Sequence, residues 1–361
     1  MVLLLSFSAL FLAFANGAND NFKGFATVWG SRSLNYRKAL FAATLATIGG
    51  SLMSLFFAQD LVRRFSGKGL VPDTVVADPA FVTSAGLGAA VTVMIATRLG
   101  MPISTTHALL GGLIGAGVTA SNSGIDLGAL GSGFVLPLLI SPVLAATLGL
   151  VAYLFIRTRR AAARDCVCIG DPVAAVTADG ATLKIVNPSP AILLAQKEDC
   201  DLLPSSTIRV SVPLLLDRVH ILSATAICFA RGVNDTPKLA ALLIAANVTG
   251  LRMSVALITL LMTVGALLMA RRVAETMSHR INQIDATQGV SANVITAALI
   301  LLASRFGLPV STTHVSVGSI AGVGAGAGTL DWSALRSVLL SWVATLPCAA
   351  AIAWLVAATL K

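Results

Sequence analysis

Two short sequence boxes carry hydroxyl groups in a pattern that suits the binding of an anion. Each box reads Pro-x-Ser-Thr-Thr-His, at residues 102–107 and 309–314, and each precedes a glycine-rich apolar stretch. Free backbone amides and the helix dipole favour negative charge at a helix start, so two such starts suit a tetrahedral oxyanion such as phosphate or sulfate. The predicted anion ligands are Ser104, Thr105, Thr106, Ser311, Thr312 and Thr313. Ordinary helix capping is the alternative, since serine and threonine are favoured there anyway.

A pair of acidic residues marks a second place where chemistry is expected. Asp20 and Asp235 each follow an asparagine and lie in apolar surroundings. A carboxylate inside a membrane costs a few kcal/mol, so each needs a cation, a proton or a basic side chain as its partner. The predicted coupling-ion or charge site, with Na⁺ as a candidate occupant at the aspartates, consists of Asn19, Asp20, Lys23, Asn234, Asp235 and Lys238. A helix N-cap is again the alternative.

Supporting roles are expected for two histidines and four glycines close to the boxes. His107 and His314 are two of the four histidines in the chain. We expect them either to orient the hydroxyl groups or to take up a proton, with hydrogen bonding to nearby backbone as the alternative. Small residues spaced four apart permit close helix packing, and the glycines interpreted in this way are Gly111, Gly115, Gly318 and Gly322.

The motifs recur because the chain is duplicated. Residues 14–23 align with residues 229–238, and residues 98–107 align with residues 305–314. Duplication with a pseudo-two-fold axis is a common way for transporters to build a central binding site. We therefore expect the two boxes to face each other across such an axis, and we expect the chain to move a small ion through the bilayer.

The elements that position these motifs are predicted to be membrane helices. Hydrophobic residues make up 56% of the 361 residues and charged residues 11%, so lipid is the expected solvent. The apolar segments, six in each half, are 2–18, 22–30, 39–58, 80–99, 104–119 and 129–156, then 212–231, 237–249, 252–271, 288–304, 311–326 and 333–360. The second and fifth of each half are short or glycine-rich, which predicts broken or re-entrant helices around a cavity.

The domain organisation follows from where the apolar segments stop. The predicted domains are an N-terminal membrane repeat at 1–156, a central loop at 157–211 and a C-terminal membrane repeat at 212–361. The loop begins with arginines, which places it in the cytoplasm by the positive-inside tendency, and interfacial anchoring explains the net charge of +9 without nucleic acid. The apolar start, Met1–Ala15, lacks a basic n-region and is interpreted as a retained first span.

The central loop carries weaker signals. Residues 181–186 and 207–212 alternate in polarity and could pair as short strands. Cys166, Cys168 and Cys200 could bind a metal, but a loose trio without histidine is a weak pattern. Reduced cytosolic thiols are the default expectation, and no cofactor is predicted beyond H⁺ or Na⁺ as a coupling ion.

Taken together, these motifs resemble the inorganic phosphate transporter family (PiT, also called Pho4), including its sulfate-permease relatives. The likeness rests on Gly17-Ala18-Asn19-Asp20, on Gly232-Val233-Asn234-Asp235, on both boxes and on the central loop, and it covers nearly the whole chain. It implies an all-α membrane protein of two inverted-topology repeats with about 10–12 transmembrane or re-entrant helical segments. It also implies a secondary active phosphate symporter, commonly a homodimer, that works by alternating access in a cell membrane, here expected to be an inner membrane.

One departure from the family pattern bears on the coupling ion. Many members carry asparagine three residues after the aspartate, where this chain has Lys23 and Lys238. We hypothesise that the ammonium groups take, electrostatically, part of the place that sodium holds in relatives, so that transport is sodium-independent or proton-linked. The alternative is that both lysines extend toward a membrane interface.

Three rival functions remain open from the sequence. A sulfate permease fits the hydroxyls almost equally well; monohydrogen phosphate carries a donor that an aspartate or histidine could accept, whereas sulfate is only an acceptor. An anion channel is also consistent with the duplication. An intramembrane hydrolase is disfavoured because catalysis needs one nucleophile and one base, and nothing selects for a second copy, so no enzyme is predicted.

Overall fold

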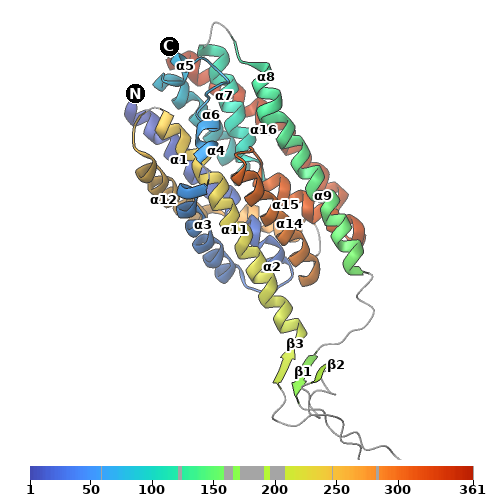
Figure 1. Cartoon of the computed structure of the whole chain (residues 1–361). Helices are drawn as coiled ribbons and strands as arrows, with labels where there is room; N and C mark the ends of the chain where they lie inside the picture. Colours follow the sequence, from blue (N-terminus) through green and yellow to red (C-terminus); the bar gives the residue numbers. More distant parts are fainter. Residues whose placement is uncertain are drawn as a thin grey trace, which may run out of the picture.

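The computed structural model shows a helical body with a small sheet at one end (Figure 1). The residues that the structure describes are 1–57, 59–120, 124–157, 166–170, 191–195, 208–245, 247–281 and 284–360. Within them, eight helices are long and apolar enough to cross a membrane. This agrees with the prediction of an all-α, multi-pass membrane protein.

The helical elements of the two halves correspond in order. The N-terminal half contains α1 (Val2–Asp20), η1 (Lys23–Phe25), α2 (Ala26–Gly30), α3 (Tyr36–Phe57), α4 (Gln59–Phe65), α5 (Asp73–Val76), α6 (Pro79–Arg98), α7 (Thr105–Ala120), α8 (Leu127–Leu130), η2 (Gly131–Val135) and α9 (Leu136–Arg157). The C-terminal half contains α11 (Val212–Ala245), α12 (Leu251–Met269), α13 (Arg271–His279), α14 (Ala286–Arg305), α15 (Thr312–Ala327) and α16 (Trp332–Leu360). The helices that start at the boxes, α7 and α15, have 16 residues each, which is shorter than a full span.

Corresponding helices of the two halves run in opposite directions (Figure 1). Helix α1 starts at the end of the body where both termini lie, whereas α11 starts at the opposite end, next to strand β3. Likewise α9 leads toward the strands, and α16 ends near the N-terminus. Opposite directions of this kind are what an inverted-topology repeat requires.

The two halves are interleaved in space. Helix α16 packs on α7 of the other half and α9 packs on α15, while α1 packs on α12 and α11 on α3. Within each half, the helix before the box, α6 or α14, packs on the short helix after it. A site at the starts of α7 and α15 is therefore enclosed by helices from both halves.

Each box lies in a helical hairpin, formed by α6 and α7 in the N-terminal half and by α14 and α15 in the C-terminal half. The first helix of each hairpin is capped. Asp78 precedes Pro79 at the start of α6, and its carboxylate accepts a hydrogen bond from the amide of Ala80 at 2.8 Å. Asp285 and Gln288 form a reciprocal capping box at the start of α14. Such caps satisfy orphan amides and fix where each hairpin enters.

The four glycines of the small-residue faces lie at close helix crossings, which confirms their predicted packing role. A Cβ added at Gly115 would lie 2.0 Å from the carbonyl oxygen of Ala350 in α16. A Cβ at Gly322 would lie 2.0 Å from the carbonyl oxygen of Ala146 in α9. A Cβ added at Gly111 or Gly318 would lie 2.3 Å from the carbonyl oxygen of Leu346 in α16 or 2.5 Å from that of Pro142 in α9. The backbones can approach this closely only because the side chains are absent.

Replacement of Gly115 by alanine is expected to lower stability measurably. The added methyl group would force α7 and α16 apart, and overpacking of this kind costs about 1–3 kcal/mol. Thermal unfolding of the detergent-solubilised protein measures the effect. Gly131→Ala is the matched control, because nothing lies within 4 Å of a Cβ at that position; equal melting temperatures for the two variants would contradict the packing account.

One segment prediction was wrong. Residues 212–231 and 237–249 were expected as two segments, but α11 runs without interruption from Val212 to Ala245, with Pro237 inside it. The corresponding region of the N-terminal half is broken, since α1 ends at Asp20 and is followed by η1 and α2. Proline removes one backbone hydrogen bond, a loss that helices packed against it make tolerable in a membrane, so the polar stretch did not have to end the helix.

The described part of the central segment forms a three-stranded antiparallel sheet in the order β2-β1-β3. The strands are β1 (Cys166–Gly170), β2 (Ala191–Ala195) and β3 (Ile208–Ser211). Strand β3 falls in the predicted stretch 207–212, whereas residues 181–186 and Cys200 lie outside the described residues. Within the described part of the chain, no cluster of His, Cys, Asp or Glu residues could hold a metal ion.

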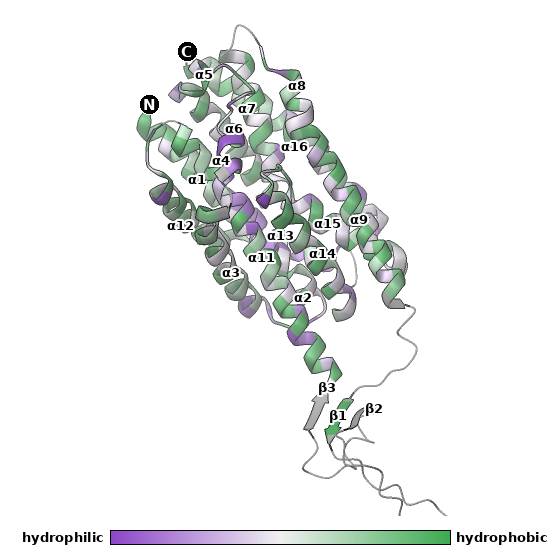
Figure 2. Cartoon of the chain, viewed as in Figure 1, coloured by the Kyte–Doolittle hydropathy of each residue, from purple (hydrophilic) through white to green (hydrophobic). Residues whose placement is uncertain are grey.

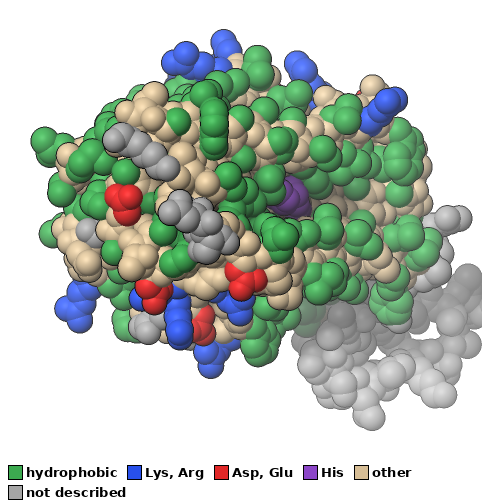
Figure 3. All heavy atoms as spheres, turned by 90° about the horizontal axis from the view of Figure 1, so that it is seen from above, with side chains coloured by type: hydrophobic (Ala, Val, Ile, Leu, Met, Phe, Trp, Pro, Cys, Tyr) green, Lys and Arg blue, Asp and Glu red, His purple; other side chains and the backbone are tan. Residues whose placement is uncertain are grey.

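The outer surface of the body is apolar, and the hydrophilic residues gather inside. Figure 2 shows hydrophobic colour over the peripheral helices and hydrophilic colour in the middle of the bundle. Large apolar side chains such as Phe56, Leu222 and Val343 are exposed. Figure 3, a view onto the end with the termini, shows hydrophobic side chains over much of the coloured surface and a histidine within a hollow. Lipid is the solvent that such a surface requires.

Candidate functional site

The two boxes meet inside the body, as the duplication predicted. The Thr106 hydroxyl donates to the carbonyl oxygen of Val310 at 3.3 Å. In the matching contact, the Thr313 hydroxyl donates to the carbonyl oxygen of Ile103 at 2.8 Å. All four residues are buried, so the starts of α7 and α15 converge at a place that is shielded from both lipid and water.

The two serines of the boxes act as helix caps. The Ser104 hydroxyl accepts a hydrogen bond from the amide of His107 at 3.0 Å, and the Ser311 hydroxyl accepts one from the amide of His314 at 3.3 Å. The capping alternative therefore applies to these two of the six predicted hydroxyls. A capping serine keeps its own proton to donate, so capping does not remove these two hydroxyls from the predicted anion ligands.

The first aspartate is fully satisfied by its neighbours. Lys23 donates to Asp20 Oδ1. The Thr105 hydroxyl and the Asn16 amide group both donate to Asp20 Oδ2, each at 3.0 Å. The structure thus gives Asp20 the basic partner that a buried carboxylate needs, and places Thr105 beside the charge site.

The second aspartate is held less completely. Asp235 Oδ1 accepts from the Asn234 amide group at 2.9 Å and lies 3.6 Å from Lys238 Nζ. Asp235 Oδ2 lies 3.5 Å from Arg231 Nε, and among the described residues it has no hydrogen-bond partner. The two halves therefore differ in how their equivalent carboxylates are satisfied.

Lys23 links its own half to the box of the other half. Its ammonium group donates to the Ile103 carbonyl oxygen at 2.9 Å and also to the Thr313 hydroxyl. The side chain is 2% exposed. The alternative that this lysine extends to a membrane interface is wrong, since the ammonium group lies where the two boxes meet.

Lys238 makes the equivalent contacts from the C-terminal half to the box of the N-terminal half. Its ammonium group donates to the Val310 carbonyl oxygen at 2.7 Å and to the Thr106 hydroxyl at 3.0 Å. It is also 2% exposed, so interfacial extension is excluded here too. Each lysine thus binds a carbonyl oxygen of its own half and a threonine of the other, which ties the two box starts together through charged donors.

The two asparagines position the boxes. Asn19 donates to the Thr97 hydroxyl and to the Met101 carbonyl oxygen, both at 3.0 Å, at the connection between α6 and α7. Asn234 accepts from the Ser304 hydroxyl at 3.2 Å at the end of α14. These amide groups hold the hairpin turns against α1 and α11.

Arg231 is a site residue that the sequence interpretation missed. It is 1% exposed, and its terminal nitrogens donate to Asn16 Oδ1 at 2.6 Å, to Asn21 Oδ1 at 3.1 Å and to the Thr47 hydroxyl at 3.2 Å. The repeat alignment sets Arg231 against Asn16, and a basic residue in the middle of a membrane span is itself a functional signal. Attention to the mismatch in the alignment would have found it.

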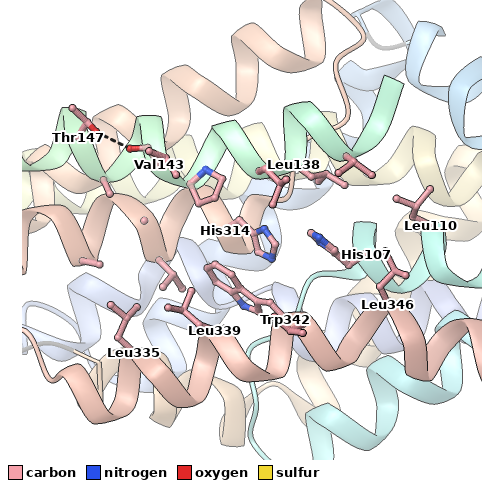
Figure 4. A pocket seen from close by; sticks show the side chains of 18 of the residues that line it. His107, Leu110, Leu138, Val143, Thr147, His314, Leu335, Leu339, Trp342 and Leu346 are labelled. Carbon is pink, nitrogen blue, oxygen red and sulfur yellow. Dashed lines mark hydrogen bonds between the residues drawn. The ribbon is translucent and has the colours of Figure 1, made fainter. Parts of the chain in front are cut away.

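The two histidines face each other behind the boxes (Figure 4). Their ring centroids are 4.4 Å apart, and His314 also stacks on Trp342 of α16 at 3.7 Å. His107 Nδ1 lies 3.0 Å from the Ser104 hydroxyl, which agrees with an orienting role. Both rings line an otherwise mostly apolar cavity of about 750 Å³ between α7, α9, α15 and α16.

The space between the boxes is small in this conformation. A cavity of about 10 Å³ is lined by Asn16, Thr105, Thr106, Leu109, Asp235, Lys238 and Leu239. That volume has room for about one water molecule. Lysine ammonium groups and threonine hydroxyls fill the rest, so a larger ligand requires them to change partners.

The fold and this site define a polytopic membrane protein whose two related halves enclose a buried, charged centre, the arrangement used by secondary transporters. The sequence matches the model of the phosphate transporter family over residues 16–353, and the chain belongs to that family.

Known relatives match nearly the whole length of this chain. A protein of Rhizobium meliloti named "Probable low-affinity inorganic phosphate transporter" is 28% identical, with 95% of this chain and 92% of the relative covered. The chloroplastic inorganic phosphate transporter 2-1 of Arabidopsis thaliana is 26% identical, with 97% and 71% covered. A solved structure titled "The sodium-dependent phosphate transporter" superimposes with a TM-score of 0.77 at 22% identity, over 100% of this chain and 98% of the other. The structural likeness supports the fold.

Proposed function

We propose that this chain is a secondary active transporter of inorganic phosphate that works by alternating access; of the two candidate coupling cations, H⁺ and Na⁺, we favour H⁺ for the reason given below. The family and the names of its relatives support phosphate as the substrate. The observation that carries the proposal is the reciprocal contact in which each buried lysine donates to a threonine of the opposite box. Cationic donors, hydroxyls and two helix starts converge there, and these are the groups that bind an oxyanion.

In the proposed complex, phosphate lies between the starts of α7 and α15. The Thr106 and Thr313 hydroxyls, which donate to carbonyl oxygens in this conformation, turn to donate to the anion. Lys23 and Lys238 likewise exchange carbonyl oxygens for anion oxygens. Every buried donor then has a partner both before and after binding, which keeps the cost of the exchange low.

The placement of the two hairpins, α6–α7 and α14–α15, supports the proposal of alternating access. In Figure 1, α6 and α7 lie toward the end with the termini, and α14 and α15 lie toward the opposite end. Each lysine ties one half to the box of the other half, so movement of a hairpin away from the centre requires these bonds to break. Bound phosphate supplies replacement partners for the lysines and couples its own binding to the movement.

Fixed cations are proposed to replace sodium at this site. Among the described residues, the cluster contains Lys23, Arg231 and Lys238 against Asp20 and Asp235. Each aspartate already has a basic partner within 4.0 Å, which removes the electrostatic demand for a bound cation. We therefore propose sodium-independent transport, with any coupling carried by protons.

Loss of the Thr106 hydroxyl is expected to reduce phosphate uptake about 10- to 100-fold, because Lys238 and the anion both lose a buried partner. Thr106→Val and the equivalent Thr313→Val should behave alike, and Thr106→Ser should retain most activity. Initial uptake of labelled phosphate into proteoliposomes measures the effect.

The matched control is Thr225→Val, whose hydroxyl donates to the Ile221 carbonyl oxygen of its own helix. This variant should transport at the wild-type rate. Unimpaired uptake by the double variant Thr106→Val/Thr313→Val would contradict the proposed binding site.

We propose a homodimer in a cell membrane, an inner membrane in a bacterial host, with the central segment in the cytoplasm. An intramembrane hydrolase finds little support, because the family consists of transporters and the Ser104 hydroxyl is engaged as a helix cap. Saturable uptake without single-channel currents would separate the transporter from an anion channel.

A further inference from the structure

We infer that Asp235 distinguishes phosphate from sulfate by accepting a hydrogen bond, at its Oδ2 atom, from the protonated oxygen of phosphate. The inference rests on the proposed function and assigns the residue that sets the substrate class within it. It starts from an asymmetry between two side chains that the duplication makes equivalent.

The asymmetry lies in the hydrogen-bond partners of the two aspartates. Both Asp20 oxygens accept hydrogen bonds, from Lys23 at one and from Thr105 and Asn16 at the other. Asp235 Oδ2 has no hydrogen-bond partner among the residues that the structure describes, although the residue is buried, with 4% of its surface exposed. A buried carboxylate oxygen without a donor is costly, so it is expected to meet one in the working cycle.

The unpartnered oxygen belongs to a residue that faces the proposed phosphate site. Asp235 lines the small cavity between the boxes together with Thr105, Thr106 and Lys238. A phosphate held by the hydroxyl of Thr106 and the ammonium group of Lys238 would therefore present an oxygen to Asp235. The opposite aspartate, Asp20, does not line this cavity.

Arg231 does not supply the missing donor. Its Nε atom lies 3.5 Å from Asp235 Oδ2 without forming a hydrogen bond, and Nε is itself without a hydrogen-bond partner in the described part of the chain. The terminal nitrogens of the same guanidinium are held by Asn16, Asn21 and Thr47. The planar group is thus anchored toward α1 and α3, which leaves Oδ2 available to a ligand.

The chemistry of the two anions makes this oxygen selective. Phosphate in neutral solution keeps at least one proton on oxygen and can donate it to a carboxylate, whereas sulfate offers acceptors only. A sulfate oxygen facing Asp235 would meet a like charge and leave Oδ2 without a hydrogen-bond donor. Sites built to pair a substrate hydroxyl reject the analogue that lacks it by large factors, about 10⁴ to 10⁵.

The charge of the cluster acts in the same direction. In their charged forms, the three basic and two acidic side chains of the cluster, counted among the described residues, leave one net positive charge. Monobasic phosphate would neutralise it, while dianionic sulfate would leave a buried negative charge. Uncompensated charge in a buried site is strongly unfavourable, so the cluster also favours the anion that keeps its protons.

The test is competition for labelled phosphate uptake in proteoliposomes, with sulfate and arsenate as unlabelled competitors. Arsenate carries the same kind of protonated oxygen and should compete as well as phosphate does. Sulfate should be at least about 100-fold weaker with the wild-type protein. In Asp235→Asn the new amide group can donate to sulfate, and the preference for arsenate over sulfate should fall to within about tenfold.

Asp20→Asn is the matched control, because it removes the same charge at the equivalent position, where both oxygens are already paired. Its preference for arsenate over sulfate should fall much less than that of Asp235→Asn, because only the charge of the cluster changes and no unpartnered oxygen is replaced by a donor. Sulfate that competes with the wild type as well as arsenate does, or equal loss of preference in both variants, would overturn the inference. Absence of phosphate uptake by the wild type would instead overturn the proposed function.

Discussion

Phosphate uptake into proteoliposomes is expected to proceed at the same initial rate when sodium is replaced by potassium on both sides of the membrane. The reason is that the ammonium groups of Lys23 and Lys238 already lie beside the buried aspartates and contact both boxes. A carrier that needs sodium in the same position would lose at least about tenfold in rate. A steep rise of flux with a sodium gradient in the wild-type protein would refute the substitution.

The double variant Lys23→Asn/Lys238→Asn tests the same idea in reverse. It removes the fixed cations and restores asparagine, so each aspartate needs a new partner. Uptake without sodium should fall about 100-fold, and sodium should recover part of it. Lys38→Asn is the matched control, because that lysine lies near the start of α3, away from the boxes. If sodium recovers uptake neither in the double variant nor in the single variants Lys23→Asn and Lys238→Asn, the lysines are structural and do not take the place of a cation.

Replacement of Arg231 by glutamine is expected to have the largest effect on stability. The guanidinium contacts α1, α3 and Asp235 at once, and removal of one partner of a buried ion pair costs about 3–5 kcal/mol. Thermal unfolding in detergent should show a much lower midpoint, with uptake lost in parallel.

A second substitution separates charge from packing at this position. In Arg231→Gln/Asp235→Asn the buried carboxylate is removed together with its cation, so part of the lost stability should return. Arg252→Gln serves as a control, since that side chain lies in the exposed first turn of α12. Strictly additive losses in the double variant would show that Arg231 and Asp235 do not interact.

The sequence predicted the convergence of the boxes because duplication carries spatial information. Two equal motifs at equal places in two repeats must be related by the axis that relates the repeats, and the contacts of Thr106 and Thr313 have that form. The glycine faces were predictable for a similar reason, since small residues spaced four apart have a single common use between membrane helices.

Other features depended on which of several possible partners a side chain meets in the fold, and the sequence does not show this. A lysine three residues after an aspartate can either pair with it or extend to the interface, and only the surrounding helices decide. Lys23 is buried because Ile103 and Thr313 provide acceptors from two different hairpins. Residues far apart in sequence thus determined the outcome.

The unequal parts of the two halves were the hardest to foresee. Pro237 and the polar residues around it predicted a break, yet α11 continues through them because neighbouring helices compensate for the lost bond. Arg231 was not predicted because a search for repeats finds positions that are identical in the two halves. This site depends on a position that differs, where Arg231 aligns with Asn16 and donates a hydrogen bond to it. That difference also leaves the two aspartates with unequal partners.

The most direct test of the central claim is an experimental structure of the protein in lipid nanodiscs with bound phosphate. We predict an anion between the starts of α7 and α15, within hydrogen-bond distance of the hydroxyls of Thr106 and Thr313 and of both lysines. This prediction would be contradicted by phosphate bound elsewhere while the boxes keep their present contacts, for example in the basic cavity of about 530 Å³ that Arg98, Arg271 and Arg272 line.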